Sequence, residues 1–237
     1  MNQVVSPSVS YSPIESPSIK LQFREAFSII HLLDLMKWES IKTPAKVNKK
    51  TILIIPGFCG GDLSVLPLKK FLCSQGHNAY SWGLGFNHGR VEEFIDPLVA
   101  LIKRLSNKHG ESVSLVGWSL GGIISRELAR FEPENIASVL TMGSPVIGGP
   151  KFTALNKLSS VFGWKPEEIE QDMIDRYATP IECPISAIYS KLDGIVSWEA
   201  CIDHWSPNVS NHEVSSSHFG MGYNKRVYEI ISQTLAK

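Results

Sequence analysis

From residue 48 onward, short apolar runs alternate with longer stretches in which apolar residues recur at helical spacing. Short runs rich in Val, Ile and Leu are typical of buried strands, whereas a period of 3.6 residues indicates amphipathic helices. We expect strands at 51–56, 79–82, 112–116, 136–142, 184–189 and 211–214. We expect helices at 64–75, 91–107, 120–131 and 225–235. This alternation predicts an α/β fold, with a mostly parallel sheet of about six strands and helices on both faces.

The interval 146–181 breaks this rhythm, because it separates two strands by more than a normal crossover requires. One helix is predicted in it by the apolar residues Phe152, Leu155, Leu158 and Val161. A second helix is opened by Pro166. Parallel sheets bind ligands at the carboxyl ends of their strands, so we interpret 146–181 as a helical cap insertion above that edge, between the strands at 136–142 and 184–189. The alternative is that 146–181 is a long connection with a purely structural role.

The beginning of the chain has a different character. Residues 1–19 are rich in Ser and Pro and contain no Lys, no Arg and no apolar stretch, which predicts a flexible tail and argues against a secretory signal. Residues 20–45 are expected to form an amphipathic N-terminal helix, because apolar side chains recur there at helical steps. This helix either packs on the main domain, 46–237, or contacts a membrane surface or a partner. Its polar side is not strongly basic, which disfavours lipid binding.

Composition narrows the classes of function. The 237 residues carry 23 Lys and Arg against 23 Asp and Glu, and this zero net charge gives no electrostatic attraction to nucleic acid. No apolar run is long enough for a transmembrane helix. The four cysteines include no C-x-x-C pair, so we expect free thiols and no metal site. We therefore expect a cytoplasmic protein, the alternative being one that is peripheral to a membrane through residues 20–45.

The strongest chemical signal is the segment 117–121, which reads Gly-Trp-Ser-Leu-Gly and is a G-x-S-x-G motif. It follows a predicted strand and precedes a predicted helix, the context in which such a turn projects its serine away from the sheet. The small residues Gly117 and Gly121 let the turn close, and the helix N-terminus favours a developing oxyanion. We predict Ser119 as a catalytic nucleophile; the alternative is a purely structural turn.

A serine hydroxyl is a weak nucleophile and needs a base. His218 follows the last predicted strand, where an imidazole can reach Ser119, whereas its main competitor, His212, lies at or in that strand. Asp193 follows the strand at 184–189, and a carboxylate there can orient the imidazole. An ordinary Asp-Gly turn is the alternative for Asp193. The order Ser, Asp, His along the chain is the one expected for this architecture.

Acyl transfer also requires N–H donors for the oxyanion. One is the backbone N–H of Leu120, the residue after the predicted nucleophile. The other is expected in the glycine-rich turn after the first strand, 57–61, whose glycines allow unusual backbone angles. We predict the N–H of Phe58 as this second donor, with Cys59 as the runner-up. Cys59 lacks the strand–turn–helix context, so a thiol nucleophile is not expected.

Taken together, these motifs resemble the α/β-hydrolase superfamily, in particular its lipase and esterase branch. The matching segments, spread over about residues 50–237, are 56–58, 117–122, 143–145, 189–198 and 217–218. The resemblance implies that Ser119, Asp193 and His218 form a catalytic triad, that Phe58 and Leu120 line an oxyanion hole, and that a helical cap covers the site.

The sequence departs from the superfamily's pattern at two places. Trp118 stands where a histidine is usual before the serine, and the first oxyanion turn reads Gly57-Phe58 where His-Gly is usual. Residues 1–45 lie outside the resemblance.

These features lead us to expect an enzyme that cleaves carboxylic esters through an acyl-enzyme on Ser119, with no metal or organic cofactor. Apolar residues in the insertion and near the motifs favour a small-molecule or lipid ester with an apolar acyl group. The alternatives are an acyltransferase or thioesterase that uses the same triad, and a non-catalytic binding module on the same scaffold.

Overall fold

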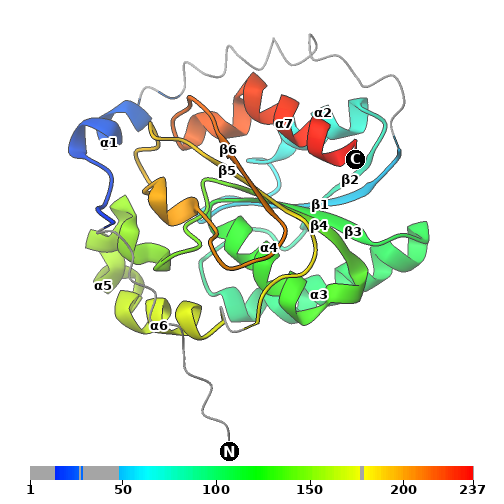
Figure 1. Cartoon of the computed structure of the whole chain (residues 1–237), viewed down its shortest axis with the longest axis horizontal. Coiled ribbons are helices and arrows are strands. Elements are labelled where there is room, and N and C mark those ends of the chain that lie inside the picture. Colours follow the sequence, from blue (N-terminus) through cyan, green and yellow to red (C-terminus); the bar gives the residue numbers. More distant parts are fainter. Residues whose placement is uncertain (1–13, 27, 29–47, 177–178, 237) are drawn as a thin grey trace, which may run out of the picture.

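A computed structural model describes residues 14–26, 28, 48–176 and 179–236. Its centre is a six-stranded sheet in the order β2-β1-β3-β4-β5-β6, in which every neighbouring pair is parallel (Figure 1). The strands are β1 (Thr51–Ile55), β2 (Asn78–Ser81), β3 (Val113–Trp118), β4 (Ile136–Met142), β5 (Ile185–Tyr189) and β6 (Val209–Glu213). The predicted α/β fold is confirmed, and the sheet is wholly parallel across the described residues.

Helices cover both faces of this sheet because successive strand residues point to opposite sides. Ile52 and Ile54 pack in one core cluster with α2 (Leu66–Ser74) and α7 (Lys225–Leu235). Leu53 and Ile55 pack in a second cluster with α3 (Val91–His109) and α4 (Leu120–Phe131). In Figure 1, α2 and α7 lie above the sheet and α3 and α4 below it. All five β1 side chains are fully buried, as expected for a strand covered on both faces.

The strand order places a switch point at the centre of the sheet. From β1 the chain moves outward to β2 and then returns to the other side of β1 with β3. At such a point the connections leave the sheet on opposite faces, and a crevice opens beyond the carboxyl ends of the strands. The carboxyl ends of β1 and β3 lead directly into the glycine-rich turn and the G-x-S-x-G turn.

The connection between β4 and β5 forms the cap, but its first part is not the single helix that the apolar spacing predicts. It consists of the 3₁₀ helices η3 (Gly149–Phe152) and η4 (Ala154–Leu158) and the short α5 (Ser159–Phe162). Thr153 separates η3 from η4 because its backbone is extended and bridges Val196. The second predicted helix is present as α6 (Pro166–Arg176).

The N-terminal segment also differs from its prediction. Residues 14–18, expected as the end of a tail, lie against the domain: Pro17 is buried, and Ser16 Oγ donates to the Thr153 carbonyl at 3.5 Å. The following helix, α1, comprises only Ile19–Glu25, with Ser18 as its N-cap. Apart from Ala26 and Ser28, the rest of the expected helix at 20–45 falls outside the described residues, as does most of the expected tail.

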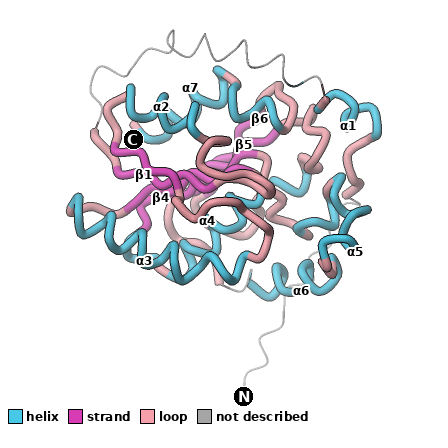
Figure 2. The backbone as a smooth tube through the Cα atoms, turned by 180° about the vertical axis from the view of Figure 1, so that it is seen from behind, coloured by secondary structure: helices cyan, strands magenta, loops and turns pink. Residues whose placement is uncertain are grey.

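Helix α1 lies at the same end of the molecule as α5 and α6, in both the front and the rear view (Figures 1 and 2). This is the end to which the carboxyl ends of the strands point. None of the helices in the described ranges is long and apolar enough to cross a bilayer.

Candidate active site

Ser119 occupies a sharp turn between β3 and α4. Strand β3 ends at Trp118 and α4 begins at Leu120, so one residue carries the whole change of direction. The backbone of Ser119 has φ 55° and ψ −121°, a conformation that is costly for a residue with a side chain and that concentrates at functional turns. A Cβ atom on Gly117 would meet the Gly121 carbonyl, and one on Gly121 would meet the Ile55 carbonyl. Both glycines are therefore required for the turn to pack this closely.

Asp193 and His218 meet beyond the ends of β5 and β6. His218 Nδ1 and Asp193 Oδ2 are 2.7 Å apart, and both side chains are almost completely buried. The other carboxylate oxygen, Oδ1, accepts from the backbone N–H groups of Ile195 and Val196, each at 2.8 Å. An ionised carboxyl group only accepts hydrogen bonds, so Nδ1 carries the proton in this pair and Nε2 is left as the basic nitrogen.

The Ser119 turn and the Asp193–His218 pair flank the end of the same strand, β4. The backbone N–H of Ser119 donates to the Met142 carbonyl at 2.8 Å. The next residue, Gly143, lies directly against the pair, since a Cβ atom on it would be 3.0 Å from both Asp193 Oδ2 and His218 Nδ1. Among the described residues, no hydrogen bond joins Ser119 Oγ to His218. The Ser119 turn and the Asp193–His218 pair are thus neighbours, but no hydrogen bond connects their side chains in the described residues.

The electrostatic environment of His218 favours its protonated form. Burial of the imidazole lowers the pKa of His218, but the Asp193 carboxylate and its hydrogen bond raise it, and the charge of Glu25 raises it further. The net result is a pKa above the ordinary value for histidine. A base with a raised pKa accepts a proton more readily, which suits the activation of a hydroxyl group.

The competing histidine and the competing oxyanion donor are both engaged elsewhere. His212 lies within β6, in register with Ile188 and not beyond the strand end. Cys59 donates its backbone N–H to the Asn87 carbonyl at 2.9 Å, so this group is already paired. Partial burial also raises the pKa of the Cys59 thiol, which disfavours a thiolate there.

The turn after β1 approaches Ser119 closely. A Cβ atom on Gly57 would lie 3.1 Å from Ser119 Cβ, so the backbone at 57–58 passes beside the serine. Leu120 is the first residue of α4, and N–H groups in the first turn of a helix have no partner within that helix. The two predicted donors, Phe58 and Leu120, thus belong to the segments on either side of Ser119 Oγ.

Asn87 holds the turn after β1 in place, a role that sequence reasoning missed. Its side-chain Nδ2 donates to the Pro56 carbonyl at 2.9 Å, and its Oδ1 accepts from Gly89 N at 3.2 Å. Its own backbone N–H donates to the Gly60 carbonyl at 2.8 Å. The side chain is fully buried. A single asparagine between β2 and α3 carries no local signal for this role, because its partners in the turn, Pro56 and Gly60, lie far away in the chain.

A second residue missed from the sequence is Glu25 of α1. Its carboxylate accepts from the backbone N–H groups of Gly194, His218 and Phe219. The local sequence gives no signal for this role, because Glu25 is one of several polar residues of α1, together with Lys20, Gln22 and Arg24.

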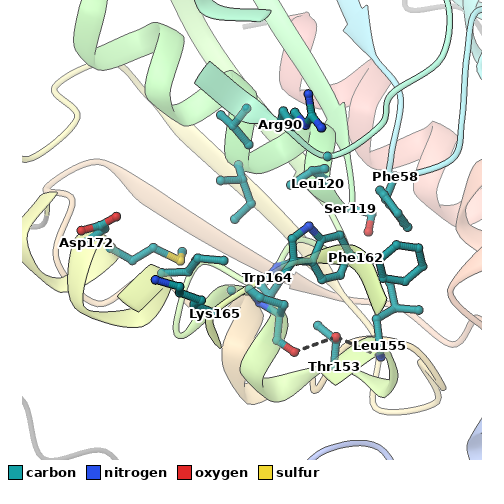
Figure 3. Close-up of a pocket in the computed structure, with 18 of the residues that line it drawn as sticks. Phe58, Arg90, Ser119, Leu120, Thr153, Leu155, Phe162, Trp164, Lys165 and Asp172 are labelled. Carbon is teal, nitrogen blue, oxygen red and sulfur yellow. Dashed lines mark hydrogen bonds between the residues drawn. The ribbon is translucent and has the colours of Figure 1, made fainter. Parts of the chain in front are cut away.

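A cavity of about 850 Å³ opens beside Ser119 under the cap. Phe58, Phe162, Leu155 and Trp164 surround its inner end near the serine, whereas Lys165 and Asp172 lie at the opposite side (Figure 3). The Phe58 ring contacts Phe162 and Trp164 edge-on, with ring centroids 5.1 and 4.9 Å away. The turn after β1 and the cap therefore form one aromatic wall. No group of three or more His, Cys, Asp or Glu side chains in the described segments could hold a metal ion.

Comparisons with known proteins find similarity in structure and not in sequence. No protein-family model matches the chain, and neither does any curated protein. The Bacillus licheniformis lipase BlEst2 is similar in structure with a TM-score of 0.60 at 14% identity, over 83% of this chain and 97% of that one.

Two further lipases show the same likeness. Lipase B of Aspergillus fumigatus has a TM-score of 0.59 at 16% identity; the alignment covers 84% of this chain but only 57% of that lipase. A monoacylglycerol lipase of Paleococcus ferrophilus has a TM-score of 0.55 at 15% identity, over 81% of this chain and 98% of that one. Together with the parallel six-stranded sheet, these similarities show that the chain has the α/β-hydrolase fold.

Proposed function

We propose that this protein is a serine hydrolase that cleaves carboxylic esters through an acyl-enzyme on Ser119. The observation that carries the proposal is the buried hydrogen bond between Asp193 and His218, at the strand end next to the strained Ser119 turn. A carboxylate that fixes the imidazole with Nε2 basic is the arrangement a serine nucleophile needs. The three structurally similar proteins named above are lipases, which supports the same reaction class for this chain.

In the first half of the reaction, His218 Nε2 takes the proton from Ser119 Oγ as the oxygen attacks the ester carbonyl carbon. Catalytic hydrogen bonds are often long in a free enzyme and tighten when substrate binds, so the Ser119–His218 bond forms at this stage. The carbonyl oxygen becomes an oxyanion that accepts from the backbone N–H groups of Phe58 and Leu120. When the tetrahedral intermediate collapses, the bond to the alcohol oxygen breaks and the His218 imidazolium gives its proton to the leaving alcohol.

In the second half, His218 takes a proton from water as the water oxygen attacks the acyl carbon. Collapse of the second tetrahedral intermediate breaks the bond to Ser119 Oγ, which takes the proton back from His218 and releases the acid. Asp193 stabilises the imidazolium in both halves without accepting its proton.

The cavity favours an apolar acyl group as the substrate portion next to Ser119. Its inner wall consists of aromatic and aliphatic side chains, including Phe58, Leu155 and Phe162. Burying methylene groups there stabilises the complex by about 0.8 kcal/mol each. Charged side chains, Lys165 and Asp172, line the cavity on the side away from Ser119 and suit a polar leaving group or solvent (Figure 3).

The test is a panel of p-nitrophenyl esters of graded acyl length, assayed with the native chain and with Ser119→Ala. We expect hydrolysis by the native chain and a fall in turnover of about 10⁴- to 10⁶-fold in the variant, as in measured triad knockouts. Near-normal hydrolysis by Ser119→Ala would defeat the assignment, and so would a folded native chain that hydrolyses none of the esters.

A further inference from the structure

Helix α1 delivers one carboxylate to the back of the candidate active site. Glu25 Oε1 accepts from Gly194 N at 2.8 Å and from His218 N at 2.7 Å, and Oε2 accepts from Phe219 N at 3.1 Å. These donors lie 169, 193 and 194 residues away in the sequence. The side chain is 6% exposed, so its charge is removed from water and its hydrogen bonds come from the protein itself.

The three donors belong to two different loops. Gly194 follows the acid of the site directly, and His218 and Phe219 are the base itself and its neighbour. One carboxylate therefore links the loop after β5 to the loop after β6. It binds the backbone of each loop at or next to the residue that carries the side chain of the site, Asp193 or His218. Buried hydrogen bonds to an ionised acceptor are short and strong, so they restrict both loops more than neutral contacts would.

The fit of α1 against the first of these loops depends on glycine. A Cβ atom on Gly194 would collide with the Leu21 carbonyl group and would lie 2.9 Å from Gln22 N. No side chain larger than hydrogen fits between α1 and the Asp193 turn. The close approach and the three hydrogen bonds are two independent signs that α1 is part of the architecture of the site.

A second link between the same loops lies closer to the strands. Ser190 Oγ donates to the Ser216 carbonyl at 2.6 Å and accepts from Ser216 N at 3.2 Å. This link fixes the bases of the loops, whereas Glu25 fixes their catalytic positions. Two sets of hydrogen bonds thus hold Asp193 close to His218: those between Ser190 and Ser216, and those to Glu25. Only the second set involves a charged group.

We propose that Glu25 is a positioning residue for the proposed reaction: it holds the backbone of His218 against the Asp193 turn and keeps the imidazole aligned. The inference rests on the ester hydrolase function proposed above. Under this proposal the N-terminal segment, which lies outside the resemblance to the α/β-hydrolase superfamily, contributes a residue to the site. Small misplacements of a catalytic group can cost about 100-fold in rate, so a residue that never touches substrate can still govern turnover.

The charge of Glu25 supplies a readout that a purely structural contact lacks. Among the described residues, the charged groups that act on His218 are Asp193, in the loop after β5, and Glu25, on α1. Burial lowers the pKa of His218, and both carboxylates raise it. Removing the charge at Glu25 while keeping its size should therefore lower the pKa of His218.

The variants are Glu25→Gln, which removes the charge, and Glu25→Asp, which keeps the charge but shortens the side chain. Gln22→Ala is the matched control, because it removes another side-chain hydrogen bond of α1, to the Pro17 carbonyl at 2.8 Å. For each protein we would titrate the His218 imidazole by NMR, measure kcat and KM on a p-nitrophenyl ester, and record Tm.

We expect Glu25→Gln to lower the pKa of His218 and to lower kcat about 10- to 100-fold with little change in KM. Glu25→Asp should keep the native pKa while kcat falls by a smaller factor, and Gln22→Ala should change neither quantity. A native pKa and native kcat in Glu25→Gln would overturn the proposal, as would an equal loss of kcat in Gln22→Ala. If Glu25→Gln does not fold, a native kcat in Glu25→Asp overturns it and a reduced kcat at native Tm supports it.

The NMR titration needs no turnover, so the two proposals can fail separately. If the native chain hydrolyses no ester, the proposed function fails, and the His218 pKa in Glu25→Gln still decides whether Glu25 acts on the imidazole.

Discussion

The two halves of the candidate site are built in opposite ways. The Ser119 turn is local: the strand before it, the helix after it and the glycines that let it close all lie within 113–131. The half that carries Asp193 and His218 is assembled from distant pieces, namely two loops, Gly143 from the end of β4, and Glu25 from the N-terminal segment. A local turn can be recognised from a short motif, whereas an assembled half depends on contacts that no single stretch of sequence contains.

The Ser119 turn and the Asp193–His218 pair are also held in place by different interactions. The Ser119 backbone is held by close packing of glycines against carbonyl groups. The Asp193–His218 pair is held by hydrogen bonds, two on Asp193 Oδ1 and three on the Glu25 carboxylate. Substitutions in the first region should therefore act through steric clash, and those in the second through alignment and charge.

The largest effect in the assembled half is expected from Asp193→Asn. An amide at this position can donate to Nδ1 and so turn the proton of the neutral imidazole to Nε2, where it cannot act as the base. We expect kcat on p-nitrophenyl esters to fall about 10⁴-fold. A loss of less than tenfold in a variant with the native Tm would contradict the role assigned to this pair.

A smaller effect is expected from Asn87→Ala, which removes the side-chain hydrogen bond to the Pro56 carbonyl at the turn after β1 and a second one from Gly89 N. Loosening this turn displaces the Phe58 N–H, and we expect kcat to fall about 10- to 100-fold with a smaller change in KM. The control is Asn78→Ala, which removes a side-chain contact to His109 on α3, at 3.1 Å. Equal kcat values in the two variants would show that the Asn87 contacts do not serve the oxyanion site.

The dependence of kcat/KM on pH reports the electrostatic environment of His218. The reaction needs neutral His218, so activity is lost as pH falls through the pKa of this residue. Because that pKa is raised, the acid limb should lie above about pH 6.5, the ordinary value for histidine. An acid limb near pH 5 would contradict this assignment of the base.

The smallest effect is expected in the cap. Phe162→Ala removes a ring that contacts Phe58 at a centroid distance of 5.1 Å, on the aromatic wall of the cavity. We expect KM for long-chain esters to rise several-fold while esters of short acids are unaffected, since each lost contact with a methylene group is worth less than about 1 kcal/mol. The neighbouring Val161, 75% exposed, provides the control Val161→Ala. An equal change for short and long esters would place the acyl chain elsewhere.

The sequence predicts those parts of the molecule that depend on local pattern. Apolar runs and helical spacing locate every strand of the sheet to within about two residues, and α4 begins and ends where its periodicity indicates. The G-x-S-x-G motif identifies the Ser119 turn because its geometry needs small residues at fixed spacing. The order of the strands also places Asp193 and His218 at one edge, where the structure joins them by a hydrogen bond.

Long-range contacts explain what the sequence does not reveal. Asn87 and Glu25 act on backbone groups that only the folded chain brings to them. In the cap, the apolar spacing suggests one helix, but a backbone bridge from Thr153 to Val196 interrupts it. This bridge is a tertiary contact, and helical propensity alone cannot foresee it.

The most direct test of the central claim is to locate the site of covalent labelling by a fluorophosphonate probe with peptide mass spectrometry. We expect the label to lie on Ser119 in the native chain, and we expect labelling to be almost abolished in His218→Ala at native Tm. A folded native chain that remains unlabelled, or one that carries the label on another residue, would contradict this claim.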